Sequence, residues 1–139
     1  MELDRIVDDA RITLDTSSFP VVLASFFGAP RADEFSAFLD GCTAVLSRRQ
    51  AFVVVVDARD AGLLDHKQIV EAAAWLERED GRRRAYCRGI ALVLPGPIQR
   101  TVLSAIVKLA AVGPHAVVAE VPEAVAWALG VMHRPIPLE

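Results

Sequence analysis

Two carboxylates, a histidine and a lysine stand close together in the stretch VVVVDARDAGLLDHKQ, residues 53–68. Asp57 ends an apolar, β-branched run that predicts a strand, and Asp65 precedes a predicted helix, followed by His66 and Lys67. Such side chains can move protons or accept phosphoryl groups, so His66 is a candidate general base or phosphohistidine. Because no serine, cysteine or acid is placed to form a triad with it, the sequence favours a solvated histidine in the first turn of the helix.

Asp65 has a structural explanation that is sufficient by itself. An aspartate at a helix N-cap accepts hydrogen bonds from free backbone N–H groups, and a glutamine three residues later can return the bond. Asp65 and Gln68 have this spacing. We therefore predict a capping box here, which stabilises a helix by about 0.5 to 2 kcal/mol.

Motifs for metal, cofactor or catalysis are not found in this sequence. The Gly96-Pro97 turn lacks the glycines and the Lys-Ser/Thr pair of a phosphate-binding loop, and there is no Gly-x-Ser-x-Gly elbow. We predict no metal, no cofactor and no enzymatic activity, with an enzyme that uses His66 and Asp57 as a distant alternative. None of the close pairings typical of metal sites occurs among the cysteines and histidines, which are Cys42, Cys87, His66, His115 and His133.

Length and composition predict one soluble domain, spanning residues 1–139 with its core at about 11–130. The 139 residues are 53% hydrophobic and 24% charged, enough for a real core in a single unit. A net charge of -3 argues against a dedicated nucleic-acid binder. The N-terminal MELDRIVDDAR does not resemble a signal peptide, and charged and turn residues interrupt the most apolar later stretch. We expect a cytoplasmic protein, with Cys42 as a reduced core thiol.

Hydrophobic periodicity predicts an α/β fold. The element order is β-β-α-β-α-β-α-β-α, which indicates a small single-domain sandwich: a mainly parallel five-stranded sheet with four helices. The first two strands are expected to pair as a hairpin. The expected strands are 11–15, 21–28, 51–58, 89–95 and 115–120, and the expected helices are 33–49, 65–79, 97–112 and 122–130.

The helix at 97–112 is too apolar to be covered by one sheet. Its polar stripe is only three residues wide. Some of its apolar side chains therefore cannot pack on the sheet and must be covered by a second copy, another protein or a membrane. We predict a homodimer or partner interface on this helix. The residues that we assign to it are Val102, Leu103 and Ile106.

The helix at 65–79 supplies the rest of the predicted interface. Trp75 lies among charged residues near its outer side, next to Arg78, and is a candidate anchor for a partner. Packing of Trp75 against the neighbouring helix is an equally open alternative. The expected inner stripe of this helix is Ile69, Ala72, Ala73 and Leu76.

An arginine-rich segment, GRRRAYCR, follows that helix. Two interpretations remain open. Cations at a helix C-terminus are favoured by the helix dipole and can simply be solvated, or they form a basic patch for an anionic lipid or an acidic partner. The arginines concerned are Arg82, Arg83, Arg84 and Arg88.

Element order and three sequence stretches together resemble a known family. The stretches are FVVVVDARDAGLLD, CRGIALVLPGPIQRTVL and HAVVAEVPEAVAWAL. Over roughly residues 11–130 the chain resembles the STAS domains of anti-sigma-factor antagonists. It is most similar to their bacterial SpoIIAA-like relatives, which are often grouped with SEC14-like lipid-binding domains.

The resemblance implies a regulatory role without the usual switch. In phosphoregulated members, a strand-end Asp is followed eight residues later by Asp-Ser-Ser-Gly, whose second serine takes the phosphate. Asp57 and Asp65 match the two aspartates, whereas His66, Lys67 and Gln68 replace Ser, Ser and Gly. We therefore expect a non-catalytic protein–protein interaction module of bacterial signalling. The alternative is a SEC14-like carrier of a lipid or small apolar ligand, with helix 97–112 lining its pocket.

Overall fold

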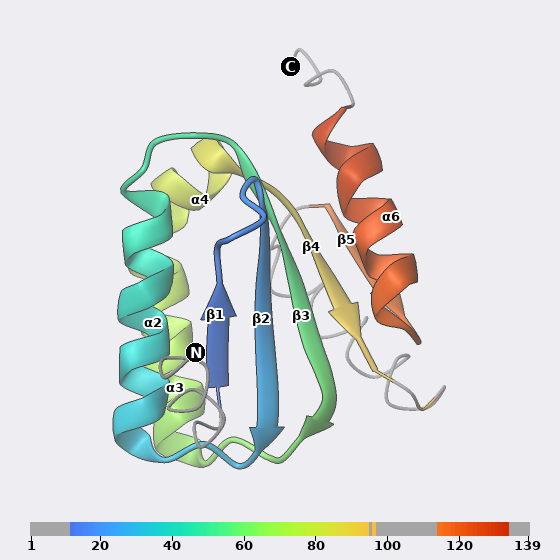
Figure 1. Ribbon diagram of the computed structural model, residues 1–139. Helices are drawn as coiled ribbons and strands as arrows, with labels where there is room; N and C mark the ends of the chain where they lie inside the picture. The colour runs from blue at the N-terminus through green and yellow to red at the C-terminus, as the bar shows by residue number, and fades with distance from the viewer. Residues whose placement is uncertain (1–11, 95, 97–113, 134–139) are drawn as a thin grey trace.

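The computed structural model describes residues 12–94, 96 and 114–133 (Figure 1). The described chain contains five strands and four helices. The strands are β1 (Ile12–Asp15), β2 (Val21–Gly28), β3 (Phe52–Ala61), β4 (Cys87–Val93) and β5 (His115–Val118). The helices are α2 (Ala32–Leu46), α3 (His66–Arg78), α4 (Asp80–Tyr86) and α6 (Val121–Met132).

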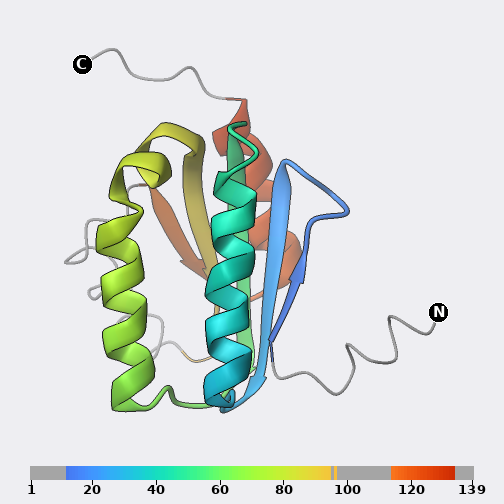
Figure 2. The same ribbon diagram turned by 90° about the vertical axis from the view of Figure 1, so that its left-hand side faces the viewer.

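The strands form one sheet in the order β1-β2-β3-β4-β5. The first pair is antiparallel, and the other three pairs are parallel. Helices α2, α3 and α4 cover one face of the sheet and α6 covers the other, as Figures 1 and 2 show. The predicted mainly parallel five-stranded α/β fold, with its N-terminal hairpin, is confirmed.

The central strand β3 is buried on both faces because its β-branched residues alternate between two apolar clusters. Val53 and Val55 have no exposed surface and pack with Ala124 and Ala128 of α6. On the other face Phe52 joins the cluster beneath α2 and α3. A strand covered on both sides is what a continuous apolar run predicts. The members of that second cluster are Ile12, Val22, Phe35, Leu39, Val45, Leu46, Phe52 and Trp75.

Helix α3 is rotated from the predicted orientation. Of the four expected inner residues, Ala72 and Leu76 pack against the core as predicted, whereas Ile69 and Ala73 are exposed, Ile69 by 54%. Gln68 and Trp75 are buried instead. The rotation places the largest apolar side chain of the helix against the core, which removes more apolar surface from water than Ile69 would.

Other element boundaries also differ from the expected ones. The segment after α3 forms the separate helix α4, so β4 begins at Cys87 instead of residue 89. Helix α6 continues past Gly130 to Met132. The predicted helix 97–112 lies outside the described residues. Within the part that the structure describes, no helix is long and apolar enough to cross a membrane.

The loop between β3 and α3 is held at Gly62 by a close backbone approach. The Gly62 N–H donates to the Gly28 carbonyl oxygen at 2.8 Å. A Cβ on Gly62 would lie 2.6 Å from the backbone nitrogen of Ala29 and 2.8 Å from the carbonyl carbon of Gly28. Since backbone atoms cannot move aside as a side chain does, only glycine fits here.

We expect Gly62→Ala to lower the free energy of unfolding by about 1–3 kcal/mol, because the added methyl group forces the two chain segments apart. Gly130→Ala is the matched control: a Cβ there meets nothing within 4 Å, inside α6. It should raise stability by about 0.5–1 kcal/mol. Urea unfolding measures both, and equal stability of Gly62→Ala and the natural chain would contradict the close approach.

Candidate interaction site

Asp57 lies within β3, four residues before its end at Ala61. The expectation of a strand-end aspartate is therefore wrong. The strand continues because β2 extends far enough to pair with it, Phe27 opposite Asp60 and Gly28 opposite Ala61. The Arg59 guanidinium donates to both Asp57 carboxylate oxygens, each at 2.8 Å. These hydrogen bonds lower the pKa of Asp57 below its ordinary value, so its carboxylate is held as an ion pair.

The predicted capping box at the start of α3 is confirmed. The Gln68 N–H donates to the Asp65 carboxylate at 2.8 Å, and the Asp65 N–H donates to the Gln68 side-chain oxygen at 3.0 Å. Gln68 is only 3% exposed, and its side-chain amide also donates to the Pro30 carbonyl at 2.9 Å. One glutamine thus fixes the start of α3 and ties it to the residues before α2.

Asp65 to Gln68, which match the Asp-Ser-Ser-Gly part of the phosphoacceptor motif, line an open hollow between the starts of α2 and α3. His66 and Lys67 are exposed at its edge. Asp57, engaged by Arg59, is not part of this hollow. The structure therefore brings together Asp65, His66 and Lys67 but not the first aspartate of the motif. The lining residues are Ala32, Asp65, His66, Lys67, Gln68, Val70 and Glu71.

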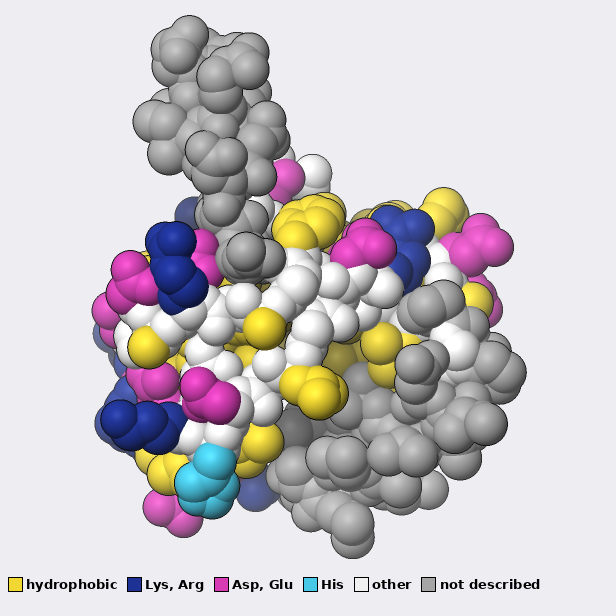
Figure 3. Space-filling model, turned by 90° about the horizontal axis from the view of Figure 1, so that it is seen from below, with side chains coloured by type: hydrophobic (Ala, Val, Ile, Leu, Met, Phe, Trp, Pro, Cys, Tyr) yellow, Lys and Arg dark blue, Asp and Glu magenta, His cyan; other side chains and the backbone are white. Residues whose placement is uncertain are grey.

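Exposed apolar side chains continue from this hollow. Leu63, in the loop before α3, is 90% exposed, and Ile69 and Val70 in the first half of α3 are 54% and 53% exposed. We call Leu63, Ile69 and Val70 the Leu63 edge. Figure 3 looks onto this end of the molecule and shows apolar side chains open between acidic and basic ones. The sequence did not predict the Leu63 edge, because the spacing of Ile69 fits the inner stripe of the helix. The signal that could have indicated it is Leu63 itself, a large apolar residue that follows Gly62 in a predicted loop.

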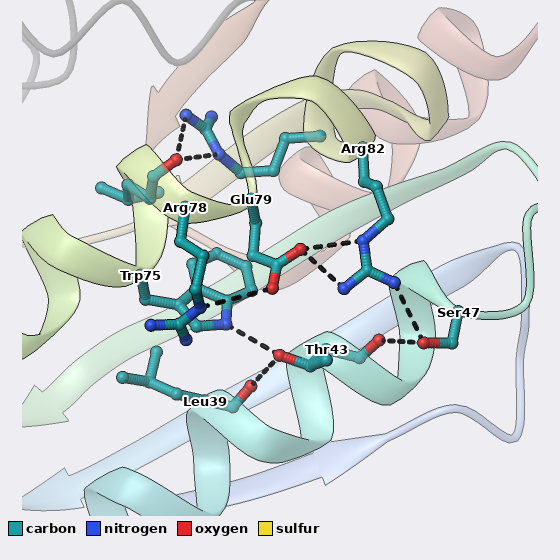
Figure 4. Close-up of polar contacts among 9 residues, drawn as sticks. Leu39, Thr43, Ser47, Trp75, Arg78, Glu79 and Arg82 are labelled. Carbon is teal, nitrogen blue, oxygen red and sulfur yellow. Dashed lines mark hydrogen bonds and ion pairs between the residues drawn. The ribbon is translucent and has the colours of Figure 1, made fainter.

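Trp75 is not a surface anchor. It is 8% exposed, and its indole N–H donates to the Thr43 hydroxyl at 2.9 Å (Figure 4). The Thr43 hydroxyl in turn donates to the Leu39 carbonyl at 3.2 Å. Of the two alternatives left open by the sequence, packing against the neighbouring helix is correct. Arg78, the other interface candidate on α3, is exposed and lies 3.7 Å from the Glu79 carboxylate.

The arginine-rich segment is largely neutralised by its own carboxylates. Arg82 donates to Glu79 at 2.8 Å, and Arg83 and Arg84 both bond to Asp80. Arg83 also donates to the Leu76 carbonyl in the last turn of α3 at 3.0 Å, where a cation suits the helix dipole. Arg88 lies apart from them, in β4. These contacts favour the solvated helix end over a patch built from this segment alone.

The two cysteines are core thiols. Cys42 and Cys87 are free and pack against the cluster beneath α2 and α3. Burial, and secondarily the nearby Cys87, raises the pKa of Cys42 to about 12, so it stays protonated and unreactive at neutral pH.

Among the described residues, no group of three histidine, cysteine or carboxylate side chains could hold a metal ion. The predicted interface residues Val102, Leu103 and Ile106 lie outside the described residues.

Solved structures with the same arrangement identify the fold. An uncharacterised DUF3478-family protein with a SpoIIAA-like fold, from Shewanella loihica, matches with a TM-score of 0.68 and 11% identity over 84% of this chain and 91% of its own. The unphosphorylated anti-sigma factor antagonist SpoIIAA matches with a TM-score of 0.55 and 16% identity over 86% and 98% of the two chains. The chain has the SpoIIAA-like fold.

An anti-sigma factor antagonist from Mycobacterium paratuberculosis has the same SpoIIAA-like arrangement, with a TM-score of 0.53 and 15% identity over 85% of this chain and 92% of its own. No family model matches the sequence, and no curated protein does. The resemblance to SpoIIAA-like STAS domains that the sequence suggested is thus confirmed at the level of the fold.

We expect Asp65→Ala to lower the free energy of unfolding by about 1 kcal/mol, because the N–H of Gln68 loses its carboxylate acceptor. Asp65→Asn is the matched control, since an asparagine side chain still accepts that bond. Chemical denaturation of both variants gives the measurement. If Asp65→Ala unfolds at the same denaturant concentration as Asp65→Asn, the cap does not stabilise α3.

We expect no phosphorylation at the start of α3 by serine kinases of the anti-sigma type, because His66 and Lys67 occupy the acceptor positions. The assay incubates the protein with such a kinase and radiolabelled ATP, beside a phosphoregulated anti-sigma factor antagonist as positive control. Label recovered in the peptide from Arg59 to Arg78 would show that another residue of this segment serves as the acceptor.

Proposed function

We propose that this protein is a non-catalytic interaction module of a bacterial regulatory system, and that it binds a protein partner at the Leu63 edge. The observation that carries the proposal is the group of three exposed apolar side chains at the start of a capped, firmly held helix: Leu63 is 90%, Ile69 54% and Val70 53% exposed. Exposed apolar side chains that lie together, with polar groups around them, mark a surface that a partner covers.

The Leu63 edge has the character of a preformed binding surface. The Asp65–Gln68 capping box and the bond from Gln68 to Pro30 fix the helix start that carries Ile69 and Val70. Little conformational entropy is then lost when a partner binds. Exposed His66 and Lys67 lie next to the apolar side chains and supply the polar rim that protein interfaces have.

A role without catalysis is supported by the state of the two candidate catalytic groups. Both oxygens of the Asp57 carboxylate accept hydrogen bonds from Arg59, which leaves the group poorly suited to act as a base. His66 is exposed to solvent in the first turn of α3, as a solvated histidine would be.

The comparisons support a partner of the protein class. Two of the similar structures are of anti-sigma factor antagonists, and that description refers to action on another protein. The proposal transfers from them only the class of partner. A cytoplasmic location and a homodimer built on helix 97–112 remain predictions, and so does the alternative of a lipid or small apolar ligand carried beside that helix.

The test is affinity capture from a native cell lysate, with mass spectrometry of retained protein and retained lipid, followed by binding measurements on the purified pair. We expect a specific protein partner whose affinity falls at least about tenfold in Leu63→Asp, because a carboxylate would replace the apolar anchor. Leu129→Asp is the matched control: Leu129 is 45% exposed on α6, on the opposite face of the sheet.

The alternative outcomes are distinct. Retained lipid without a protein partner favours the carrier function. A partner that binds Leu63→Asp as tightly as the natural chain contradicts the Leu63 edge as its binding surface.

A further inference from the structure

Two arginine-containing segments that are far apart in the sequence meet where α2 ends and α4 begins. The Arg82 guanidinium donates to the Ser47 hydroxyl at 3.2 Å, and the Arg49 Nε donates to the Tyr86 hydroxyl at 3.5 Å. In Figure 1 this is the upper end of the helix layer, opposite the loop that carries Leu63. Arg48, next to Arg49, donates to the Thr16 hydroxyl at 3.3 Å and lies over the Phe19 ring. We call Arg48, Arg49, Arg78 and Arg82 the arginine surface.

The arginine surface has more positive charge than its carboxylates neutralise. Glu79 is 7% exposed and is paired with Arg82 at 2.6 Å and with Arg78 at 3.7 Å. Of the neighbouring acids, Asp80 is engaged by Arg83 and Arg84, and Asp15 accepts a hydrogen bond from the Ser17 N–H, which leaves its negative charge in place. Arg49 is exposed, and the Arg78 and Arg82 side chains are 64% and 41% exposed. Several guanidinium N–H groups therefore face solvent.

Arg49 is held in a strained backbone conformation. Its φ is 58°, in the left-handed region where a glycine is normally found after a helix. The Arg49 N–H donates to the Leu46 carbonyl at 3.2 Å and so completes the end of α2. A side chain in this conformation costs about 1–2 kcal/mol relative to glycine. Strain kept at an exposed cation is an indication that the guanidinium itself is used.

The surroundings of the arginine surface decide which anion it fits. Large exposed apolar side chains in the described part of the chain are Phe27, Leu63, Ile69, Val70 and Leu129, none of which belongs to it. Docking to a membrane uses inserted apolar side chains beside the cations, and these are missing here. A long nucleic acid would extend beyond these few arginines over a chain whose net charge is -3, whereas a short acidic segment can be confined to the arginine surface. Guanidinium groups match carboxylates through paired hydrogen bonds.

We propose that the arginine surface binds an aspartate- and glutamate-rich segment of a protein. This surface lies at the other end of α3 from the Leu63 edge, so the proposal goes beyond the function given above. It is tested with a peptide instead of the unidentified partner, and the two proposals can therefore fail separately.

The experiment measures binding of a fluorescently labelled oligoglutamate peptide by anisotropy at low ionic strength, with oligoglutamine of the same length for comparison. We expect oligoglutamate to bind, and Arg49→Gly to weaken that binding by about fivefold through loss of one exposed charge contact. Arg49→Gly should also raise the free energy of unfolding, since glycine relieves the left-handed strain. Weaker binding then cannot be attributed to a damaged fold.

Arg31→Gly is the matched control. Arg31 has a 70% exposed side chain at the start of α2, at the opposite end of the helix layer, and its removal changes the net charge equally. Binding that falls equally in Arg31→Gly, or no binding of oligoglutamate by the natural chain, would overturn the proposal. So would tighter binding to phosphatidylserine vesicles or to single-stranded DNA than to oligoglutamate.

Discussion

The hydrogen bond from the Trp75 indole to the Thr43 hydroxyl, 2.9 Å long, determines how α3 packs against α2. A buried indole N–H without an acceptor would cost a large part of what burial of the ring gains, so Trp75 can enter the core only where α2 presents one. The bond therefore fixes the rotation of α3 about its axis. Among the described residues no buried side-chain nitrogen or oxygen atom lacks a partner, so the layer closes without a polar cost.

That rotation has consequences at both ends of α3. At its start, burial of Gln68 and Trp75 on one side leaves Ile69 and Val70 on the solvent side, beside Leu63. At its end, Glu79 is buried against α4, where Arg82 neutralises it and reaches Ser47. The exposure of Ile69 and Val70 and the burial of Glu79 are thus linked through the orientation of one helix.

The fold of this chain does not depend on the phosphorylated serine that the resemblance associates with it. In this chain the start of α3 is held by a capping box and by the bond from Gln68 to Pro30, and these need no phosphate. His66 and Lys67 occupy the positions at which the resemblance places the serines. The start of this helix is thus held in place by contacts within the chain itself.

The sequence by itself determined the features that depend on residues close together in the chain. These are the buried strand β3 with its β-branched residues, the two ends of β2 and the Asp65–Gln68 capping box, and all three were predicted correctly. The end of β3 was not, because Asp60 and Ala61 extend the strand only through pairing with Phe27 and Gly28.

The tertiary structure alone decided the orientation of α3 and the grouping of the arginines. Periodicity allowed Ile69 or Trp75 on the inner side of α3, and Thr43, 32 residues away, selected Trp75. Likewise, Arg82 meets Ser47 only because α4 turns back toward the end of α2. Such contacts join distant segments and are chosen by competition for a shared core, which a local pattern does not encode.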